Sequence, residues 1–299
     1  MKSIIFTISS SKMLTIGDLL QAGIFECYSV SAIDLHVQPS ESSSISEFKS
    51  VLFGVKKESS LGFNLSFDSQ VYELSIDDLA TVSDWTGALM FIRMLLSLLD
   101  VEICQNEGIE YNVDSILEFR YTSIFVAAIS ELSNLLKSNP LIELMGVRRP
   151  IYINELFLSQ LLNVSDDKII TQYDRCLLFT QQLNAYYSEQ EVFKLEQNGS
   201  DTYITVNYLN CEVPTILPVE PILNMQYRMH NPNLNIYASY VFIMTSDGKK
   251  LAEVPYREFL QSLTEGIGML DAKHMLVEPL STRKLEKLLK KMKKQFPNS

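Results

Sequence analysis

The segment from Leu89 to Leu99 constrains the fold of this chain more than any other. If it is helical, apolar residues cover nearly all of its circumference. A helix without a polar face has to be buried on most of its sides. Ser83-Asp84-Trp85-Thr86, with a small polar residue and an acid, predicts the start of this helix. We therefore expect a buried helix at the centre of the N-terminal half. Trp85, the only tryptophan, is expected to be a core anchor rather than a stacking platform for a ligand.

Short β-prone runs surround this helix and recur later in the chain. Val51–Val55, Leu61–Phe67 and Val71–Ile76 are separated by short polar turns, and the second and third alternate between apolar and polar residues. They predict an antiparallel meander with one solvent-facing side. Asn198-Gly199 and Asp247-Gly248 each stand between two β-prone runs and predict hairpins. The pattern indicates an α+β protein of two associated halves, each a small, mainly antiparallel sheet packed with helices.

The limits of the two halves follow from helix stops and a change in composition. Ser138-Asn139-Pro140 ends a predicted helix over 122–137, since proline disfavours helical geometry in the residue before it. We expect an N-terminal half over 1–140, a C-terminal half over 147–280 and a basic terminal helix over 281–299. The apolar run Ile4–Ile8 is short and broken by Thr7, so it predicts a strand rather than a signal peptide. No run of about 18 apolar residues exists, so we expect no transmembrane segment.

The charge of the chain excludes some classes of partner. The net charge is −11, although residues 281–299 hold seven of the 25 basic residues and one of the 36 acids. An acidic body of this kind repels a phosphate backbone, which disfavours nucleic-acid binding. The four cysteines lie 77, 72 and 35 residues apart, so they predict neither a redox motif nor a metal clamp. A reducing cytoplasm is the expected compartment.

The inventory of catalytic groups is thin. There are three histidines, His36, His230 and His274, and no glycine-rich phosphate loop, zinc-type spacing or nucleophile elbow. We therefore expect no cofactor and no metal, and the residue content favours a protein without catalytic activity over an enzyme. The best catalytic candidates are Asp271 and His274. On a helix they would share one face, where the carboxylate could orient the imidazole as a general base; the alternative is a structural hydrogen-bonded pair at a helix turn.

Two short basic segments are candidates for binding an anionic ligand. Arg148 and Arg149 precede a predicted strand and could clamp a carboxylate or phosphate, although an ion pair within the protein explains them equally. Arg228 and His230 could be presented to an anion by the segment ahead of the second hairpin. The alternative there is an ordinary polar loop.

The C-terminal segment predicts a basic helix with one continuous apolar stripe. Leu285, Leu288, Leu289, Met292 and Phe296 follow helical spacing, and lysines cover most of the other positions. Such a helix can bind a protein partner, an anionic membrane or nucleic acid. The alternative is that the stripe docks on the acidic body of the same chain.

With these motifs in place, the chain resembles an uncharacterised bacterial family of cytoplasmic proteins of about this length, known from Gram-positive hosts such as streptococci. The resemblance rests on the Gly62-Phe63 strand after a Phe-Gly-Val strand, on the Asp84-Trp85 helix start, and on the segment from Asp271 to His274 before a terminal helix. It spans nearly the full chain. It implies no activity and no catalytic or binding residues.

Three hypotheses for function follow. The first is a non-enzymatic binding or regulatory protein that acts through an acidic surface on a protein partner of unknown identity. The second is an enzyme whose site is assembled from distant residues around Asp271 and His274. The third is association with a membrane surface through the basic C-terminal helix. The sequence leaves the oligomeric state open.

Overall fold

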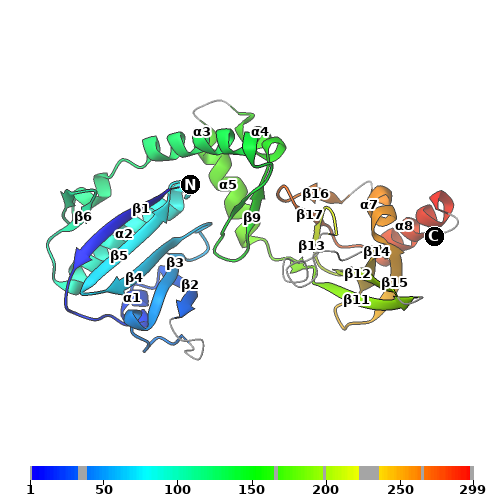
Figure 1. Cartoon of the computed structure of the whole chain (residues 1–299), viewed down its shortest axis with the longest axis horizontal. Coiled ribbons are helices and arrows are strands. Elements are labelled where there is room, and N and C mark those ends of the chain that lie inside the picture. Colours follow the sequence, from blue (N-terminus) through cyan, green and yellow to red (C-terminus); the bar gives the residue numbers. More distant parts are fainter. Residues whose placement is uncertain are drawn as a thin grey trace. The chain divides into compact units, whose positions relative to one another are not determined.

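The computed structural model describes residues 2–32, 39–164, 168–197, 200–221, 236–263 and 266–296. The chain divides into two compact units, Met1–Gln182 (unit 1) and Leu183–Ser299 (unit 2). Each unit combines helices with mainly antiparallel sheets (Figure 1). The predicted α+β class is therefore confirmed.

The division between the units lies later in the chain than the predicted boundary at 141–146. Within unit 1, β8 (Ile142–Leu144) pairs antiparallel with β9 (Ile151–Ile153), and the Val147 amide donates to the Ser60 carbonyl at 2.8 Å. Helices α4 (Glu155–Leu162) and α5 (Ile169–Gln182) then pack on each other. These long-range contacts hold the segment in unit 1, and no local signal in the sequence encodes them.

The described part of unit 1 contains one sheet of seven strands in the order β2-β3-β4-β5-β1-β6-β7, with every neighbouring pair antiparallel. The strands are β1 (Ser3–Ser9), β2 (Phe25–Ala32), β3 (Phe48–Val55), β4 (Phe63–Asp68), β5 (Val71–Asp77), β6 (Cys104–Asn106) and β7 (Ile109–Tyr111). The predicted meander is confirmed as β3-β4-β5. The short helix α1 (Ile16–Leu20) connects β1 to β2.

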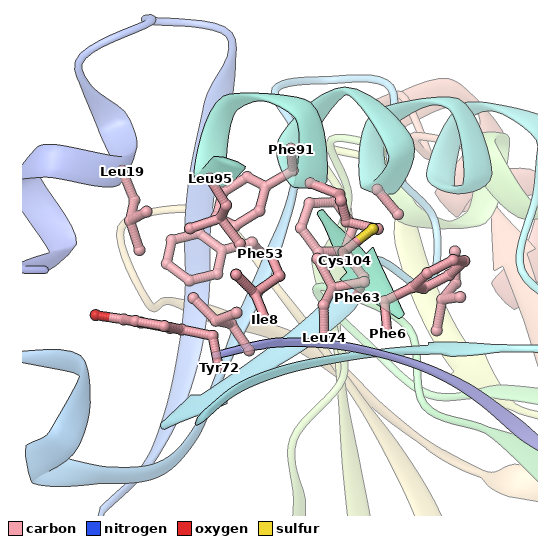
Figure 2. Packing of buried hydrophobic residues seen from close by; sticks show 14 of the residues in the cluster. Phe6, Ile8, Leu19, Phe53, Phe63, Tyr72, Leu74, Phe91, Leu95 and Cys104 are labelled. Carbon is pink, nitrogen blue, oxygen red and sulfur yellow. The ribbon is translucent and has the colours of Figure 1, made fainter. Parts of the chain in front are cut away.

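Helix α2 (Val82–Leu99) covers one face of this sheet. Its residues Phe91 and Leu95 point at Phe53, Phe63 and other sheet side chains to form the core of unit 1 (Figure 2). The predicted buried helix is confirmed, but it begins two residues earlier than expected. The reason is a capping box, in which the Thr81 hydroxyl accepts from the Asp84 amide and the Asp84 carboxylate accepts from the Thr81 amide.

Trp85 is fully buried at the start of α2 and is the predicted core anchor. Its ring stacks on Tyr121 at 5.4 Å between centroids and on Phe119 at 5.8 Å. Among the described residues, α2 is the one helix long and apolar enough to cross a membrane. Its packing in the core between sheet and loop residues accounts for that composition.

Helices α3 (Thr122–Ser138), α4 and α5 follow α2 in the chain of unit 1. Helix α3 contacts α4, and α5 contacts α2. The Phe125 ring of α3 meets the Tyr173 ring of α5 edge to face at 5.1 Å. The Tyr173 hydroxyl donates to the Leu79 carbonyl at 2.9 Å, just ahead of α2. These contacts place α5 beside the N-terminus of α2.

The described part of unit 2 contains two four-stranded sheets. The first has the order β11 (Gln190–Gln197), β12 (Ser200–Asn210), β14 (Ile236–Met244), β15 (Lys250–Pro255), and the second has the order β10 (Tyr186–Tyr187), β13 (Thr215–Pro218), β17 (His274–Val277), β16 (Ile267–Met269). Both predicted hairpins form, as β11-β12 and β14-β15. Gly248 takes φ +83° in the second turn, as Asp-Gly turns require; Asn198 and Gly199 lie outside the described residues.

The basic C-terminal segment forms α8 (Thr282–Gln295), whose apolar stripe docks on unit 2. Leu285, Leu288 and Met292 are buried in a cluster with Phe259 of α7 (Tyr256–Ser262) and with strand residues, and Leu289 packs on it partly buried. Phe296, the last member of the predicted stripe, lies just beyond the helix and is half-buried. Of the alternatives that the sequence left open, docking on the chain's own body is the one observed.

The docking of α8 predicts a stability effect. Leu288→Ala removes a buried side chain and leaves a cavity, so we expect the free energy of unfolding to fall by about 2–4 kcal/mol. Lys290→Ala on the exposed side of the same helix is the control and should stay within about 0.5 kcal/mol. Urea unfolding followed by circular dichroism measures both. Equal effects of the two substitutions would contradict docking of the stripe.

Candidate functional site

The structure describes one of the two basic segments predicted to bind anions, the one at Arg148 and Arg149. The backbone amides of Arg148 and Arg149 donate to Oε1 of Gln181 at 2.9 and 3.2 Å, and Nε2 of Gln181 donates back to the Arg149 carbonyl at 3.0 Å. These bonds fix the backbone of the turn before β9 to α5. Arg228 and His230 lie outside the described residues, as does His36.

Asp271 and His274 do form a pair, but on a turn rather than a helix. One carboxylate oxygen, Oδ1 of Asp271, accepts from the amides of Lys273 at 2.8 Å and His274 at 2.7 Å, which closes the turn that leads into β17. Nδ1 of His274 lies 3.1 Å from both carboxylate oxygens. The spacing of three residues therefore brings the groups together through an aspartate-capped turn.

Tyr187 completes this arrangement and was missed in the sequence. Its hydroxyl lies 2.8 Å from Nε2 of His274, although the two residues are 87 positions apart. The contact spans the second sheet of unit 2, since β13 separates β10 from β17. Asp271 and His274 are 2% and 8% exposed, whereas Tyr187 is 44% exposed. We call these three residues the Asp271–His274–Tyr187 relay.

A second candidate site lies in unit 1, on the face of the sheet that α2 leaves uncovered. Along each strand, alternate residues face the core, and the residues between them face the other way. Ser75 of β5 is directly flanked there by Ile5 of β1 and Asn64 of β4. This face contains a cavity of about 390 Å³, close to the lower limit for small-molecule sites. We call it the open-face pocket.

Polar and apolar groups share the lining of the open-face pocket. Five serines contribute to it, namely Ser3, Ser29, Ser31, Ser50 and Ser75. Asn64 adds an amide, and Leu52, Leu61, Leu144 and Met145 add apolar surface. The lining thus offers hydrogen-bonding groups beside an apolar surface of similar extent. No sequence motif marks it, because its residues come from segments between positions 3 and 145.

Two carboxylates, Asp77 and Glu143, are the charged groups of this lining. Burial raises the pKa of Asp77 to about 6, a bond from the Leu79 amide opposes that rise, and the adjacent Asp78 carboxylate adds to it. Asp77 lies in the wall of this cavity, at the end of β5.

The wall of the open-face pocket is held in shape by Asp84. This fully buried carboxylate accepts hydrogen bonds from the amides of Ser60, Leu61 and Gly62 at 3.1, 2.9 and 2.9 Å, and from the amide and hydroxyl of Thr81 at 3.2 and 2.7 Å. Gly62 takes φ +70°, and a Cβ there would lie 2.5 Å from the Phe53 carbonyl. Glycine is therefore required at this bend.

The comparisons with known proteins identify a family. A family model described as a domain of unknown function, DUF4299, matches residues 3–288. The chain belongs to the DUF4299 family. No curated protein matches the chain, and no solved structure does. The Gly62-Phe63 strand and the Asp84-Trp85 helix start, on which the resemblance rested, are joined in this DUF4299 chain by the hydrogen bond from Gly62 to Asp84.

The net charge of this DUF4299 chain is confined to unit 1. Residues 1–182 contain 12 basic and 23 acidic residues, a net charge of −11, whereas residues 183–299 contain 13 of each. The lysines of α8 therefore balance the acids of their own unit. The described ranges contain no cluster of three or more His, Cys, Asp or Glu residues arranged to hold a metal ion.

Replacing Asp84 tests its role in the pocket wall. Asp84→Ala would leave three loop amides buried without their acceptor, so we expect a loss of about 3–5 kcal/mol in stability. Trp85 is the only tryptophan, so its fluorescence during urea unfolding follows unit 1. Asp68→Ala, an exposed acid at the end of β4, should change stability by less than about 0.5 kcal/mol. A loss below 1 kcal/mol for Asp84→Ala would contradict the assigned role.

The raised pKa values in unit 1 predict its response to pH. Burial raises the pKa of Asp77 and of Asp174 in α5 to about 6. Because the folded state holds these protons more tightly than the unfolded chain, the stability they contribute is present near pH 4 and is lost as pH rises through about 6. Asp174→Asn should therefore raise stability at about pH 7.5 by roughly 1 kcal/mol, allowing for partial exposure, and by less at about pH 5.

Asp18 is a control for this pH dependence, because its pKa is lowered rather than raised by folding. Hydrogen bonds from the backbone and side chain of Thr15 lower the pKa of Asp18. Asp18→Asn should therefore reduce stability at neutral pH, and the reduction should diminish as the pH falls through the lowered pKa. Thermal unfolding of both variants across the pH range separates the two cases. A destabilised Asp174→Asn variant at neutral pH would contradict the burial argument.

Proposed function

We propose that unit 1 of this DUF4299 chain is a non-enzymatic binding domain whose ligand occupies the open-face pocket. The ligand class is a small, hydroxyl-rich molecule that is neutral or carries an amine. The observation that carries the proposal is a lining of five serines, one asparagine and two carboxylates in a cavity of about 390 Å³. Hydroxyls and amides both donate and accept hydrogen bonds, which matches a polyhydroxylated ligand.

The negative charge of the pocket and of unit 1 favours a ligand with an amine over a ligand with a phosphate group. Among the described residues of the lining, Asp77 and Glu143 are the ionisable groups, and none is a lysine, arginine or histidine. Unit 1 as a whole carries the −11 charge, so its field attracts cations and repels anions. A phosphorylated ligand would meet two carboxylates without a cation to neutralise it.

The side chains of the open-face pocket favour binding over catalysis. Within the part of the lining that the structure describes, its serine hydroxyls have no histidine to act as their base. Leu52 and Leu61 offer apolar surface to the C–H groups of a ligand, a role that needs no chemistry. For the compartment we propose the cytoplasm, which is supported by the free thiols of Cys27, Cys104 and Cys211.

Three molecules with the same sugar ring and different charges test the proposed function. At neutral pH, isothermal titration should rank glucosamine above glucose and glucose above glucose 6-phosphate. The ring is shared, and the pocket carboxylates attract the ammonium group of glucosamine and repel the phosphate group of glucose 6-phosphate. Asp77→Asn should weaken glucosamine binding about tenfold, or about 1.4 kcal/mol, and leave glucose binding nearly unchanged.

Glu73 provides the matched control for Asp77. It lies on the same strand and the same sheet face, but outside the lining of the pocket. Glu73→Gln should therefore leave all three affinities unchanged. Tighter binding of glucose 6-phosphate, or equal effects of Asp77→Asn and Glu73→Gln, would overturn the proposal.

A further inference from the structure

The Asp271–His274–Tyr187 relay lies in unit 2 and takes no part in the proposed ligand binding. We propose that Tyr187 is a nucleophilic site that accepts an acyl group from an activated ester or thioester, with His274 as its base. This inference goes beyond the proposed function and depends on different residues. It rests on the contacts of His274 with Asp271 and with Tyr187, and on the partial exposure of Tyr187.

The proton positions follow from the chemistry of the acceptors. An ionised carboxylate only accepts hydrogen bonds, so Nδ1 of His274, at 3.1 Å from both oxygens of Asp271, carries the proton. In the neutral imidazole, Nε2 is then an acceptor. The Tyr187 hydroxyl at 2.8 Å therefore donates to Nε2. Nε2 of His274 thus already accepts a hydrogen bond from the proton that the phenol loses when its oxygen attacks the acyl carbon.

The three residues of the relay differ in their exposure to solvent. Asp271 and His274 are 2% and 8% exposed, so the carboxylate holds the ring orientation in a site largely shielded from water. Tyr187 is 44% exposed, so an electrophile can reach its side chain from solution. The order of carboxylate, imidazole and attacking hydroxyl is the one that activates nucleophiles in acyl-transfer enzymes.

The transfer step balances with an acyl donor alone. The phenol oxygen of Tyr187 forms a bond to the acyl carbon while its proton passes to Nε2 of His274. The bond from the acyl carbon to the leaving oxygen or sulfur breaks, and the leaving group takes the electron pair and then the proton from the imidazolium. The relay supplies a proton acceptor but no cation, so it suits a neutral acyl carbon better than a phosphoryl group, whose transfer depends on charge neutralisation.

Tyr208 in the same unit provides an internal comparison. Its hydroxyl donates to Oε2 of Glu191 at 2.7 Å, so its partner is a carboxylate rather than an imidazole. Burial and this hydrogen bond raise the pKa of Tyr208 to about 12. A partly exposed tyrosine that lacks the histidine should therefore react slowly. Tyr208 therefore serves as the slow reference, and substitution of His274 measures the contribution of the imidazole.

A purely structural relay makes a different prediction. The contact joins β10 to β17 across β13, so it could stabilise the second sheet of unit 2 without activating the phenol. In that case, substitutions in the relay would change the unfolding temperature and leave the reactivity of Tyr187 equal to that of Tyr208. The two cases separate in one experiment.

The experiment is acetylation of the full-length protein by p-nitrophenyl acetate, with site-resolved mass spectrometry over time. We expect Tyr187 to be acetylated about 100-fold faster than Tyr208, in line with the usual gain from general-base assistance. His274→Gln should bring Tyr187 down to the rate of Tyr208, and Tyr187→Phe should remove the fast site. Equal rates for the two tyrosines in the unmodified protein would overturn the proposal.

Asp271→Asn tests the positioning residue while sparing the fold. Its amide oxygen can still accept from the Lys273 and His274 amides, which keeps the turn closed, whereas its NH₂ group favours the other tautomer of the imidazole. We expect the fast acetylation of Tyr187 to drop at least about tenfold with an unchanged unfolding temperature. An unchanged acetylation rate in this folded variant would overturn the role given to Asp271.

Discussion

The buried carboxylate of Asp84 is the interaction on which the structure of unit 1 depends. Two oxygen atoms accept five hydrogen bonds, from the 60–62 loop and from Thr81. One residue thereby caps α2, fixes the bend at Gly62 and joins the loop before β4 to the core helix. Without such donors, a carboxylate at 0% exposure would be strongly destabilising.

Other acids gather close to the start of α2, and this concentration links the fold to the site. Asp174 of α5 accepts from the Val82 amide through both oxygens at 3.2 and 3.1 Å. Asp78 accepts from the Lys2 amide at 2.9 Å, and Asp77 faces the open-face pocket. The partial positive charge of a helix N-terminus offsets some of the repulsion. Burial raises the pKa of Asp77 and Asp174, and the neighbouring carboxylates Asp78 and Asp84 add to that rise.

Local patterns in the sequence were sufficient to predict the elements. The apolar surround of Leu89–Leu99 predicted the core helix, alternation predicted the β3-β4-β5 meander, and Asp-Gly predicted the β14-β15 hairpin. Each signal depends on residues a few positions apart. The end of unit 1 at Gln182 was not predictable, because it is set by contacts such as Val147 with Ser60 and Gln181 with Arg149.

The residues of the two candidate sites were also predictable only where they lie close together in the sequence. Asp271 and His274 are close in sequence, so their pairing was anticipated, although an aspartate-capped turn rather than a helix produces it. Tyr187 is 87 residues from His274, and only sheet topology brings it there. The open-face pocket collects serines from several strands, and a single serine on a strand carries no sign of a ligand. Side chains that converge through long-range topology were therefore invisible in the sequence.

The most direct test of this account is a nitrogen-15 NMR titration of the full-length protein with glucosamine. The account predicts chemical-shift changes at the amides of Gly62, Asn64 and Ser75 around the open-face pocket. Amides of β14 in unit 2, such as that of Ile243, should not move. Shifts confined to unit 2, or no saturable shift at all, would contradict the claim that the serine-lined sheet face of unit 1 is the binding site.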